Sequence, residues 1–363
     1  MKRTEKGIAM AKVGIITFLH NDNFGSSLQA YALQRTICAL GAEAEHMDYR
    51  PDGAEKIRNY ISSGNSPALI LDGLRKRKVK SSMAGARKKS RAIPDFYRRS
   101  LRLSPVCRNR SELKKQCGKY DLLICGSDQI WNPVWLNQAY FLPFAPAETR
   151  KIAYAASLGV SRLPSEAKQK KMRKWLIGFD AISVREEEGA VLLEKMTGKR
   201  AEVMPDPVCL LTRNEWETVM TAPPVARGAY LLCYFIGENT AYWETVRQLQ
   251  TELQLEVLVV PVTAESFSAE YEKLDGLGPE EFLSALHGAA AVCTDSFHCF
   301  VFSTIFEKPC TVCRRDREDD PESKNSRLDS FRRELGREGL EGLRNKGIRW
   351  LETQLERIKP EKT

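Results

Sequence analysis

Short apolar runs that stop at small or polar residues recur along this chain, and they limit the fold more than any other feature. Residues 13–18 form the first run, and residues 120–125, 152–156 and 181–184 form later ones. Each run has the length of a buried strand, and stretches with helical periodicity lie between them. Strands that alternate with helices predict an α/β fold with a parallel sheet.

A second series of such elements begins after Met204-Pro205-Asp206-Pro207, where two prolines favour an extended connector. The chain is long enough for two domains. We therefore expect an N-terminal Rossmann-like domain over residues 1–204, with a basic helical insertion at about 66–116, and a second such domain over 205–340. Residues 341–363 are expected to form an amphipathic helix that packs back on the first domain. The cleft between the domains is the expected place for the substrates to meet.

Composition places the chain among globular proteins, with 42% hydrophobic and 28% charged residues and a net charge of +9. No apolar stretch could span a bilayer, and the N-terminal residues lack the apolar region of a signal peptide, so we expect a cytoplasmic protein. The basic excess lies at residues 75–115. It is either a solvated helical face or a surface for an anionic partner, such as the inner face of a membrane. Aromatic residues are sparse there, which argues against nucleic acid.

The segment Thr294-Asp295-Ser296-Phe297-His298 follows an apolar run and precedes another, so it predicts a strand end that leads into a helix. Ligands of α/β sheets bind at the carboxyl ends of the strands. His298 could perform acid–base chemistry there. The alternative is that Asp295 and Ser296 only cap the helix and that His298 packs beside it.

Two further strand ends carry polar groups. Asn23 and Gly25 precede a predicted helix, whose free N–H groups suit an anion, although ordinary turn and cap chemistry explains both residues equally well. A second group follows residues 120–125, where Ser127, Asp128 and Gln129 could bind sugar hydroxyls. Asp128 could also accept a proton, or it could instead cap the following turn. Trp131 could offer a surface to a sugar, or it could instead be a core tryptophan.

Cationic candidates for an anion site come from two places. Arg185 directly follows a buried strand, where its guanidinium could bind a phosphate or carboxylate, or pair with a neighbouring glutamate. The sequence Lys324-Asn325-Ser326-Arg327 opens a helix at Leu328. Positive charge at a helix start opposes the helix dipole, a local conflict that a bound phosphate would resolve.

Taken together and in order, these segments resemble the polysaccharide pyruvyl transferase family over nearly the whole chain. The matching segments are Asn23-Phe24-Gly25, residues 28–34, Tyr120-Asp121, residues 126–132, residues 154–159, Ser183-Val184-Arg185-Glu186, Asp206-Pro207, residues 294–298 and Asn325-Ser326-Arg327-Leu328.

The resemblance implies two facing Rossmann-like domains of the GT-B type. It implies an enzyme of cell-surface polysaccharide (exopolysaccharide) biosynthesis that transfers a pyruvyl group from phosphoenolpyruvate to sugar hydroxyls of a glycan or its lipid-linked precursor, forming a pyruvate ketal. His298 would be the general acid/base and Arg185 would bind the donor. The chemistry requires no metal or redox cofactor. Ser296 departs from family members that carry arginine at this place, and Lys324, Arg327, Arg314 or Arg315 would then supply the missing charge.

The donor site is thus predicted to include Arg185, Ser296 and Lys324 to Arg327, the acceptor site Asn23, Gly25, Ser127, Gln129 and Trp131, and the catalytic pair His298 and Asp128. Two other functions fit the same residues. One is a GT-B glycosyltransferase that uses a nucleotide sugar, which would release a nucleoside diphosphate instead of phosphate. The other is a non-catalytic protein that binds acidic polymers through residues 75–115.

Overall fold

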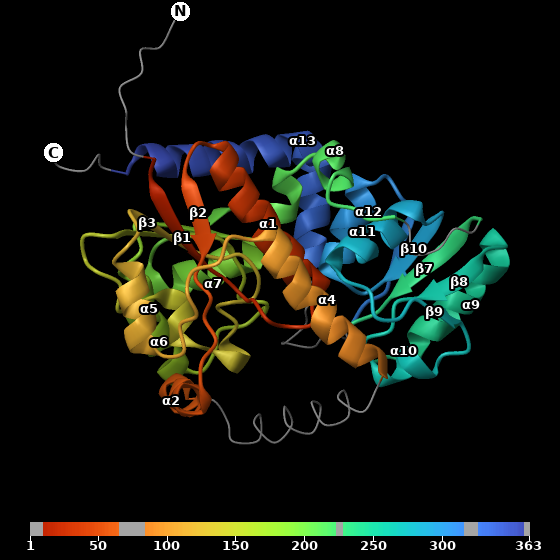
Figure 1. Cartoon of the computed structure of the whole chain (residues 1–363), viewed down its shortest axis with the longest axis horizontal. Coiled ribbons are helices and arrows are strands. Elements are labelled where there is room, and N and C mark those ends of the chain that lie inside the picture. Colours follow the sequence, from red (N-terminus) through yellow and green to blue (C-terminus); the bar gives the residue numbers. More distant parts are fainter. Residues whose placement is uncertain (1–9, 65–83, 223–227, 316–325, 359–363) are drawn as a thin grey trace, which may run out of the picture.

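The chain forms two separate parallel sheets (Figure 1) in the computed structural model, which describes residues 10–64, 84–222, 228–315 and 326–358. The first sheet has the strand order β2-β1-β3-β4-β5-β6 and the second the order β11-β10-β7-β8-β9, and all paired strands are parallel. The predicted fold class, two α/β units with parallel sheets, is confirmed. The first sheet consists of β1 (Lys12–Ile16), β2 (Glu43–His46), β3 (Leu122–Cys125), β4 (Arg150–Ala156), β5 (Ala181–Val184) and β6 (Glu202–Val203).

The second sheet consists of β7 (Tyr230–Tyr234), β8 (Glu256–Val259), β9 (Glu272–Lys273), β10 (Ala291–Thr294) and β11 (Cys310–Val312). Its central strands β7 and β10 are buried along their whole length, as is β3 in the first sheet. Strands covered on both faces need apolar side chains on both faces. This explains why they appear in the sequence as continuous apolar runs without alternation.

Helices cover both sheets. Those of the first half are α1 (Phe24–Ala39), α2 (Gly53–Ser63), α4 (Ala84–Ser100), α5 (Arg110–Cys117), α6 (Glu166–Leu176) and α7 (Glu187–Thr197), with the short 3-10 turns η1 (Pro133–Trp135), η2 (Gln138–Phe141) and η3 (Pro207–Leu210). Those of the second half are α8 (Arg213–Glu217), α9 (Ala241–Leu253), α10 (Ala264–Ser268), α11 (Pro279–Gly288), α12 (Phe297–Ile305) and α13 (Ser326–Glu356). None of the helices in the described ranges is long and apolar enough to cross a membrane.

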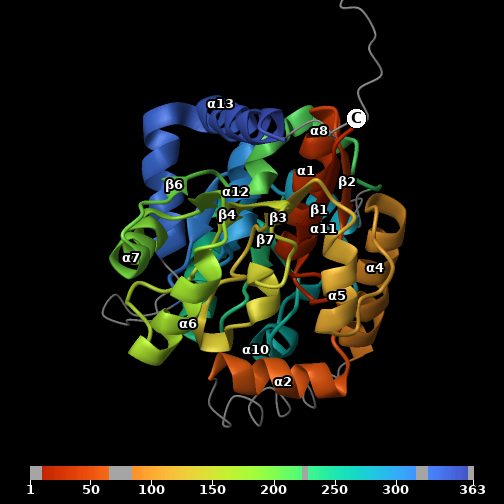
Figure 2. The same cartoon turned by 90° about the vertical axis from the view of Figure 1, so that its left-hand side faces the viewer.

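The last helix, α13, starts fifteen residues earlier than the predicted terminal helix and bends at Gly339, whose φ of 67° and ψ of 169° are not helical. It runs along the top of the molecule from the second half to the first (Figures 1 and 2). There the Trp350 indole N–H donates to Glu202 of β6 at 2.7 Å, and Leu351 is buried in the same apolar cluster as Ile152 of β4. Residues 326–356 therefore connect the two sheets.

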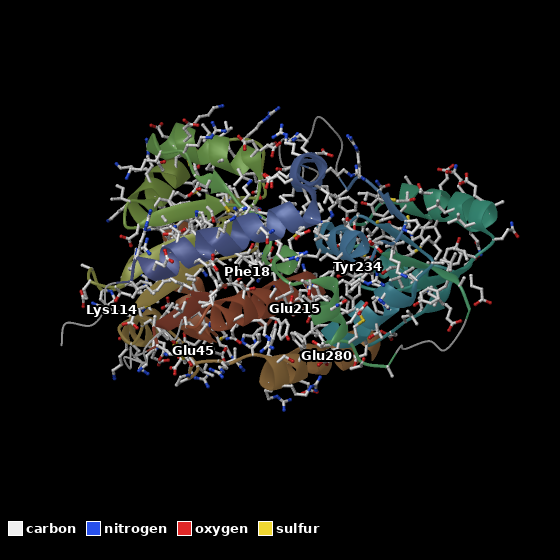
Figure 3. All side chains as sticks on the ribbon, turned by 90° about the horizontal axis from the view of Figure 1, so that it is seen from above. Phe18, Glu45, Lys114, Glu215, Tyr234 and Glu280 are labelled. Carbon is white, nitrogen blue, oxygen red and sulfur yellow. The ribbon has the colours of Figure 1, made fainter. Side chains whose placement is uncertain are left out.

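The two halves share an apolar core. Phe24 of α1 stacks on Phe282 of α11 at 4.6 Å between ring centroids, and it also contacts Tyr234 of β7. Seen from above, Tyr234 lies in the interior near the middle of the molecule, whereas Lys114 lies at the outer end of the first half (Figure 3). This packing brings the N-terminus of α1 against the N-terminus of α12, where His298 lies.

The basic insertion is only partly described. Residues 75–83 and the side chains of residues 84–91 lie outside the described part of the structure. In the remainder of α4, Phe96 and Tyr97 are buried in the shared core, and Arg99 pairs with Glu280 of α11 at 2.5 Å. This end of α4 therefore contributes to the packing between the halves. Exposed cations continue beyond it at Arg102, Arg108, Lys114 and Lys115.

Candidate active site

Three ionisable side chains from distant parts of the sequence meet at the centre of the molecule. Arg185 follows β5, Asp206 precedes η3, and His298 lies in the first turn of α12; all three are buried. Arg185 Nη1 lies 2.5 Å from Asp206 Oδ2, and His298 Nε2 lies 3.5 Å from the same oxygen. Burial raises the pKa of Asp206, but His298 and Arg185 lower it by more, so the net pKa lies well below the usual range. Asp206 is therefore a buried carboxylate that lies against both Arg185 and His298.

Gly25 allows α1 to approach the histidine closely. A Cβ atom at Gly25 would lie 2.1 Å from His298 Nδ1, far inside van der Waals contact. The Gly25 N–H itself donates to the side chain of Asn23, which caps α1. Glycine is used where a backbone must come this close to another group, so the first half of the chain forms one wall of the histidine's pocket.

Asp128 reaches the same cluster from the end of β3. Its Oδ2 accepts a hydrogen bond from Ser26 Oγ at 2.5 Å, its Oδ1 accepts from the Gln129 N–H, and Arg185 Nη2 lies 3.8 Å from Oδ1. Because donors already engage both of its oxygens, the Asp128 carboxylate is placed to orient Arg185. The same hydrogen bonds make Asp128 poorly placed for its predicted role as a proton acceptor.

Glu186 provides the third carboxylate around Arg185. Its Oε1 accepts from Ser157 Oγ and from the N–H groups of Leu158 and Gly159, while its Oε2 lies 4.0 Å from Arg185 Nε. Burial lowers the pKa of Arg185, but the surrounding carboxylates raise it by more. The face of the guanidinium rests on the Phe297 ring, 4.5 Å from its centroid, so Arg185 is charged and held in one orientation.

Arg327 brings a second buried guanidinium to the site from the first turn of α13. The Gln129 amide, with its oxygen turned toward this group, accepts from Nη1 at 2.7 Å and from Nη2 at 2.9 Å. Burial, together with Arg185 and Arg315, lowers the pKa of Arg327 to about 9. Arg327 thus remains charged at neutral pH although two other guanidinium groups act on it.

Several buried polar atoms of these residues have no hydrogen-bond partner within the described part of the structure. They are Arg185 Nε and Nη2, Arg327 Nε, Glu186 Oε2 and His298 Nε2. Buried polar groups are nearly always satisfied, and an unsatisfied group calls for an explanation. Guanidinium donors suit a phosphate or carboxylate. A bound anion would satisfy the arginine donors, and Arg185 and Arg327 are therefore the strongest candidates for anion binding.

The residues of the segment from Thr294 to His298 have different structural roles. Ser296 is the N-cap of α12, and its Oγ accepts from the Cys299 N–H at 3.4 Å. The Asp295 carboxylate accepts from the N–H groups of Ile236 and Gly237, each at 2.7 Å, and from Arg315 Nε at 2.8 Å. Ser296 is thus a helix cap, while Asp295 secures the loop after β7 and holds a third guanidinium near the site.

A cavity of about 350 Å³ adjoins this cluster between the two halves. It is lined by Asn21, Asp22 and Asn23 from the loop before α1, and by Tyr234, Ile236 and Val262 from the second half. Asn23 binds the Gly25 N–H and Ile236 binds Asp295, so both walls connect to the histidine segment. A larger cavity of about 500 Å³ lies at the amino ends of β5 and β6, and none of the predicted site residues lines it.

Some predicted site residues do not face a ligand. Trp131 is fully buried and stacks on Phe141 at 5.1 Å, so the prediction that it offers a surface to a sugar is wrong. The Ser127 hydroxyl donates to the Ala155 carbonyl and is also fully buried. Both lie within three residues of Asp128 in the sequence, yet their side chains belong to the packing of the first half. Lys324, Asn325 and the side chain of Ser326 lie outside the described part of the structure.

Sequence reasoning did not identify Asp206 and Glu186 as site residues. Asp206 lies between two prolines, a pattern that predicts a connector, and Glu186 is the first of three consecutive glutamates, which resemble an exposed helix start. The available signal was position, because Glu186 follows a strand end directly beside Arg185. The pairing of Asp206 with both Arg185 and His298 depends on contacts across more than 20 residues of sequence.

The fold and the site together define an enzyme with two facing Rossmann-like domains and a buried site that combines a histidine with cationic side chains. A sequence model of the family "Polysaccharide pyruvyl transferase" matches residues 23–317. The chain belongs to this family and is a transferase. Comparison with curated protein sequences gave no significant match.

Solved structures with the same fold are GT-B-type enzymes. A putative UDP-N-acetylglucosamine 2-epimerase from Listeria monocytogenes is 12% identical, with a TM-score of 0.51 over 97% of this chain and 92% of that chain. The UDP-GlcNAc 2-epimerase from Methanocaldococcus jannaschii is 11% identical, with a TM-score of 0.50 over 95% of this chain and 99% of that chain. At such low identity, the likeness concerns the fold alone.

Proposed function

We propose that the protein transfers a pyruvyl group from phosphoenolpyruvate to two hydroxyls of a sugar, forming a pyruvate ketal. One observation carries the proposal: among the described residues, buried guanidinium donors of Arg185 and Arg327 have no hydrogen-bond partner, and Arg185 shares Asp206 with His298. Phosphoenolpyruvate carries a phosphate and a carboxylate that such donors could bind. Its enol carbon needs a proton, which a histidine could supply. Family membership supports the reaction class.

The proposed mechanism begins with protonation of C3 of the donor by His298, which turns the CH2 group into a methyl group. Positive charge then develops at C2, and a sugar hydroxyl adds there. Phosphate leaves, and a second hydroxyl closes the ring. Asp206, 3.5 Å from His298 Nε2, would compensate the charge of the doubly protonated ring, and Arg185 would stabilise the departing phosphate. These steps involve no change in oxidation state of a cofactor. Of the two protons that the sugar hydroxyls lose, one balances the proton that His298 gives to C3, and the other leaves with the phosphate.

Donor binding and turnover test the proposal directly. We expect phosphoenolpyruvate to raise the melting temperature of the protein, and phosphate release to require a suitable glycan. Arg185→Ala should abolish the thermal shift, whereas His298→Ala should retain it and lower turnover by about 100-fold or more. The control variant His287→Ala changes a histidine that pairs with Glu217 on α8, away from the site, and should behave as wild type.

Other outcomes identify the alternative functions. A thermal shift with nucleotide sugars, together with release of nucleoside diphosphate, would identify the donor as a nucleotide sugar and not phosphoenolpyruvate. Binding of acidic polymers that survives Arg185→Ala and His298→Ala but is lost on neutralising Arg108, Lys114 and Lys115 would point to a non-catalytic binding protein. Either result would contradict the proposed reaction.

The acceptor is proposed to be a cell-surface polysaccharide or its lipid-linked precursor, modified in the cytoplasm close to the inner face of the membrane. The exposed cations Arg102, Arg108, Lys114 and Lys115 support this proposal, because such a group attracts anionic lipid surfaces. Sedimentation with vesicles that contain anionic lipid, compared with neutral vesicles, tests the membrane contact separately from catalysis.

A further inference from the structure

A second histidine–carboxylate pair lies at the carboxyl edge of the first sheet. His20, in the loop after β1, directs Nε2 at Asp48 Oδ1 over 2.7 Å. Asp48 follows β2 and is buried, whereas 23% of the His20 side chain is exposed. Arg50 donates to both oxygens of Asp48, each at 2.8 Å. The carboxylate is therefore fixed from two sides, and it fixes the imidazole in turn.

This arrangement determines which nitrogen of His20 carries the proton. Burial raises the pKa of Asp48, but His20 and Arg50 lower it by more, so this carboxyl is ionised and only accepts hydrogen bonds. In the neutral imidazole the proton must then be on Nε2. The other nitrogen, Nδ1, keeps its lone pair and has no hydrogen-bond partner among the described residues. A histidine held in this way by a carboxylate is arranged as a base.

The pair belongs to the same sheet edge as the candidate active site. The three residues after His20 line the cavity of about 350 Å³ between the halves. Within the same loop, Asn21 Nδ2 donates to Ser26 Oγ at 3.1 Å, and Ser26 donates to Asp128 beside Arg185. The His20 ring also packs edge-on against Tyr97, whose hydroxyl bonds Ser27 at 2.9 Å. The loop that carries His20 thus lines this cavity from the first half, and His298 belongs to the second half.

The proposed reaction has to move two protons. Two sugar O–H bonds break and two C–O bonds form at C2 of the donor, while the C2–O bond to phosphate breaks. One hydroxyl proton is balanced by the proton that C3 gains, and the other leaves with the phosphate. Asp128, engaged by Ser26, Gln129 and Arg185, is poorly arranged to collect a hydroxyl proton. The reaction therefore needs a base on the acceptor side, opposite His298.

We propose that His20 is this base: its Nδ1 takes the proton from the attacking sugar hydroxyl, while Asp48 and Arg50 are positioning residues. The inference rests on the proposed function and deepens it by assigning the acceptor side of the reaction. His46 shows the contrast, because it is fully buried, bonds the Ala30 carbonyl at 2.9 Å, and has a pKa lowered by burial to about 4. That histidine is a structural residue of the core.

Asp48 also has a structural role, which the test must distinguish from its role in positioning His20. Its N–H bonds Ser104 Oγ at 3.0 Å, and its carbonyl accepts from the Cys107 N–H at 2.8 Å. On the Asp48 side, both contacts are made by backbone atoms and not by the carboxylate. Asp48→Asn retains them and removes only the carboxylate charge that orients His20, so it is a better probe than alanine at this position.

The test compares His20→Ala, His20→Gln and Asp48→Asn with wild type, using phosphoenolpyruvate and a panel of p-nitrophenyl galactosides, glucosides and mannosides as acceptors. His20→Ala and His20→Gln should lower kcat for ketal formation by about 100-fold, and Asp48→Asn should lower it by about 10-fold or more. The KM for phosphoenolpyruvate and the thermal shift that it causes should stay unchanged. The matched control is His287→Ala, since His287 also pairs with a carboxylate, at 3.2 Å, and its side chain is 34% exposed.

Each outcome is decisive. A wild-type kcat in His20→Ala overturns the inference, while His298→Ala still tests the donor side. Loss of the phosphoenolpyruvate shift in His20→Ala also overturns it, because the residue would then act in donor binding or folding. If wild-type protein forms no ketal with any glycoside and shows no shift with phosphoenolpyruvate, the proposed function itself fails and the inference falls with it.

Discussion

Gly25 decides how closely α1 can approach His298. A Cβ atom there would lie 2.1 Å from the imidazole, so Gly25→Ala must displace either the ring or the loop. Misplacing a catalytic group by about 1 Å can cost about 100-fold in rate. We therefore expect Gly25→Ala to lower kcat by about that factor, measured by phosphate release from phosphoenolpyruvate in the presence of an accepted glycoside.

Gly53 offers a matched control, because an added Cβ there meets no atom within 4 Å. Gly53→Ala should leave kcat unchanged. In a His298→Ala background, Gly25→Ala should also cost far less stability than it does alone, because the colliding ring is gone. Equal losses in both backgrounds would contradict a direct clash between the two residues.

Asp206 should make stability depend on pH. Its folded-state pKa lies below the ordinary value, so the stabilisation is fully present above about pH 4, the unfolded pKa, and is lost as the pH falls toward the depressed folded value. Asp206→Asn should lower the free energy of unfolding at pH 7 by about 3–5 kcal/mol, since it leaves the buried Arg185 without its nearest carboxylate. Asp206→Asn should also make the free energy of unfolding depend less on pH between pH 3 and 7.

Urea unfolding at several pH values between 3 and 7 measures this effect. Glu217→Gln is the control, because Glu217 is an exposed carboxylate paired with Arg213 and solvent screens that pair. A steep acid dependence that persists in Asp206→Asn would assign the effect to another group.

At single positions, the sequence could indicate Arg185 and His298 because Arg185 directly follows a strand end and His298 lies four residues after one, where ligands of α/β sheets gather. It could not indicate Asp206, whose two partners lie 21 and 92 positions away. It also misjudged Trp131, because a tryptophan beside polar residues has the same sequence pattern whether it faces a sugar or stacks on Phe141.

Among the elements, α13 carries a bend whose cause can be tested. Gly339 has φ 67° and ψ 169°, a conformation that only glycine adopts readily, so Gly339→Ala should destabilise the protein by about 1–3 kcal/mol. Gly336 lies three residues earlier in an exposed helical turn, and an added Cβ there meets nothing within 4 Å. Gly336→Ala should therefore stabilise by about 0.5–1 kcal/mol.

Urea unfolding of the two variants gives opposite signs if the bend is intrinsic to Gly339. A destabilised Gly336→Ala variant would show that the two segments of α13 are not helical where the backbone places them.

Strands were easier to predict than this helix. A buried parallel strand is a short apolar run, so β3 and β10 stand out in the sequence. The first part of α13 contains Gly336, Gly339 and Gly342, which lower helix propensity, and its helical state depends on packing against η3 and α12. The sequence therefore predicted a helix start at Leu328 and a separate amphipathic helix after residue 341, but not one helix that joins them.

For the whole molecule, two α/β units can be predicted from the order of the apolar runs, but the way they face each other cannot. That arrangement depends on contacts such as Phe24 with Phe282 and Tyr234, and on α13 lying across both sheets. The contacts of Phe24 join residues more than 200 positions apart, and no periodic pattern in the sequence predicts them. The composite site follows from the same arrangement, since Gly25 and His298 meet only when the halves pack.

The shared core predicts that the two halves unfold together. Calorimetry of the wild type should show one transition whose van't Hoff and calorimetric enthalpies agree. Phe24→Ala removes a ring that packs on the second half, at a cost of about 3–5 kcal/mol, and should lower the ratio of the two enthalpies or separate two transitions. Phe141→Ala removes a ring of equal size that packs on Trp131 and Trp175 within the first half. It should lower the melting temperature and keep the enthalpy ratio closer to one than Phe24→Ala does. Two separate transitions in the wild type would show that the contacts around Phe24 do not couple the halves.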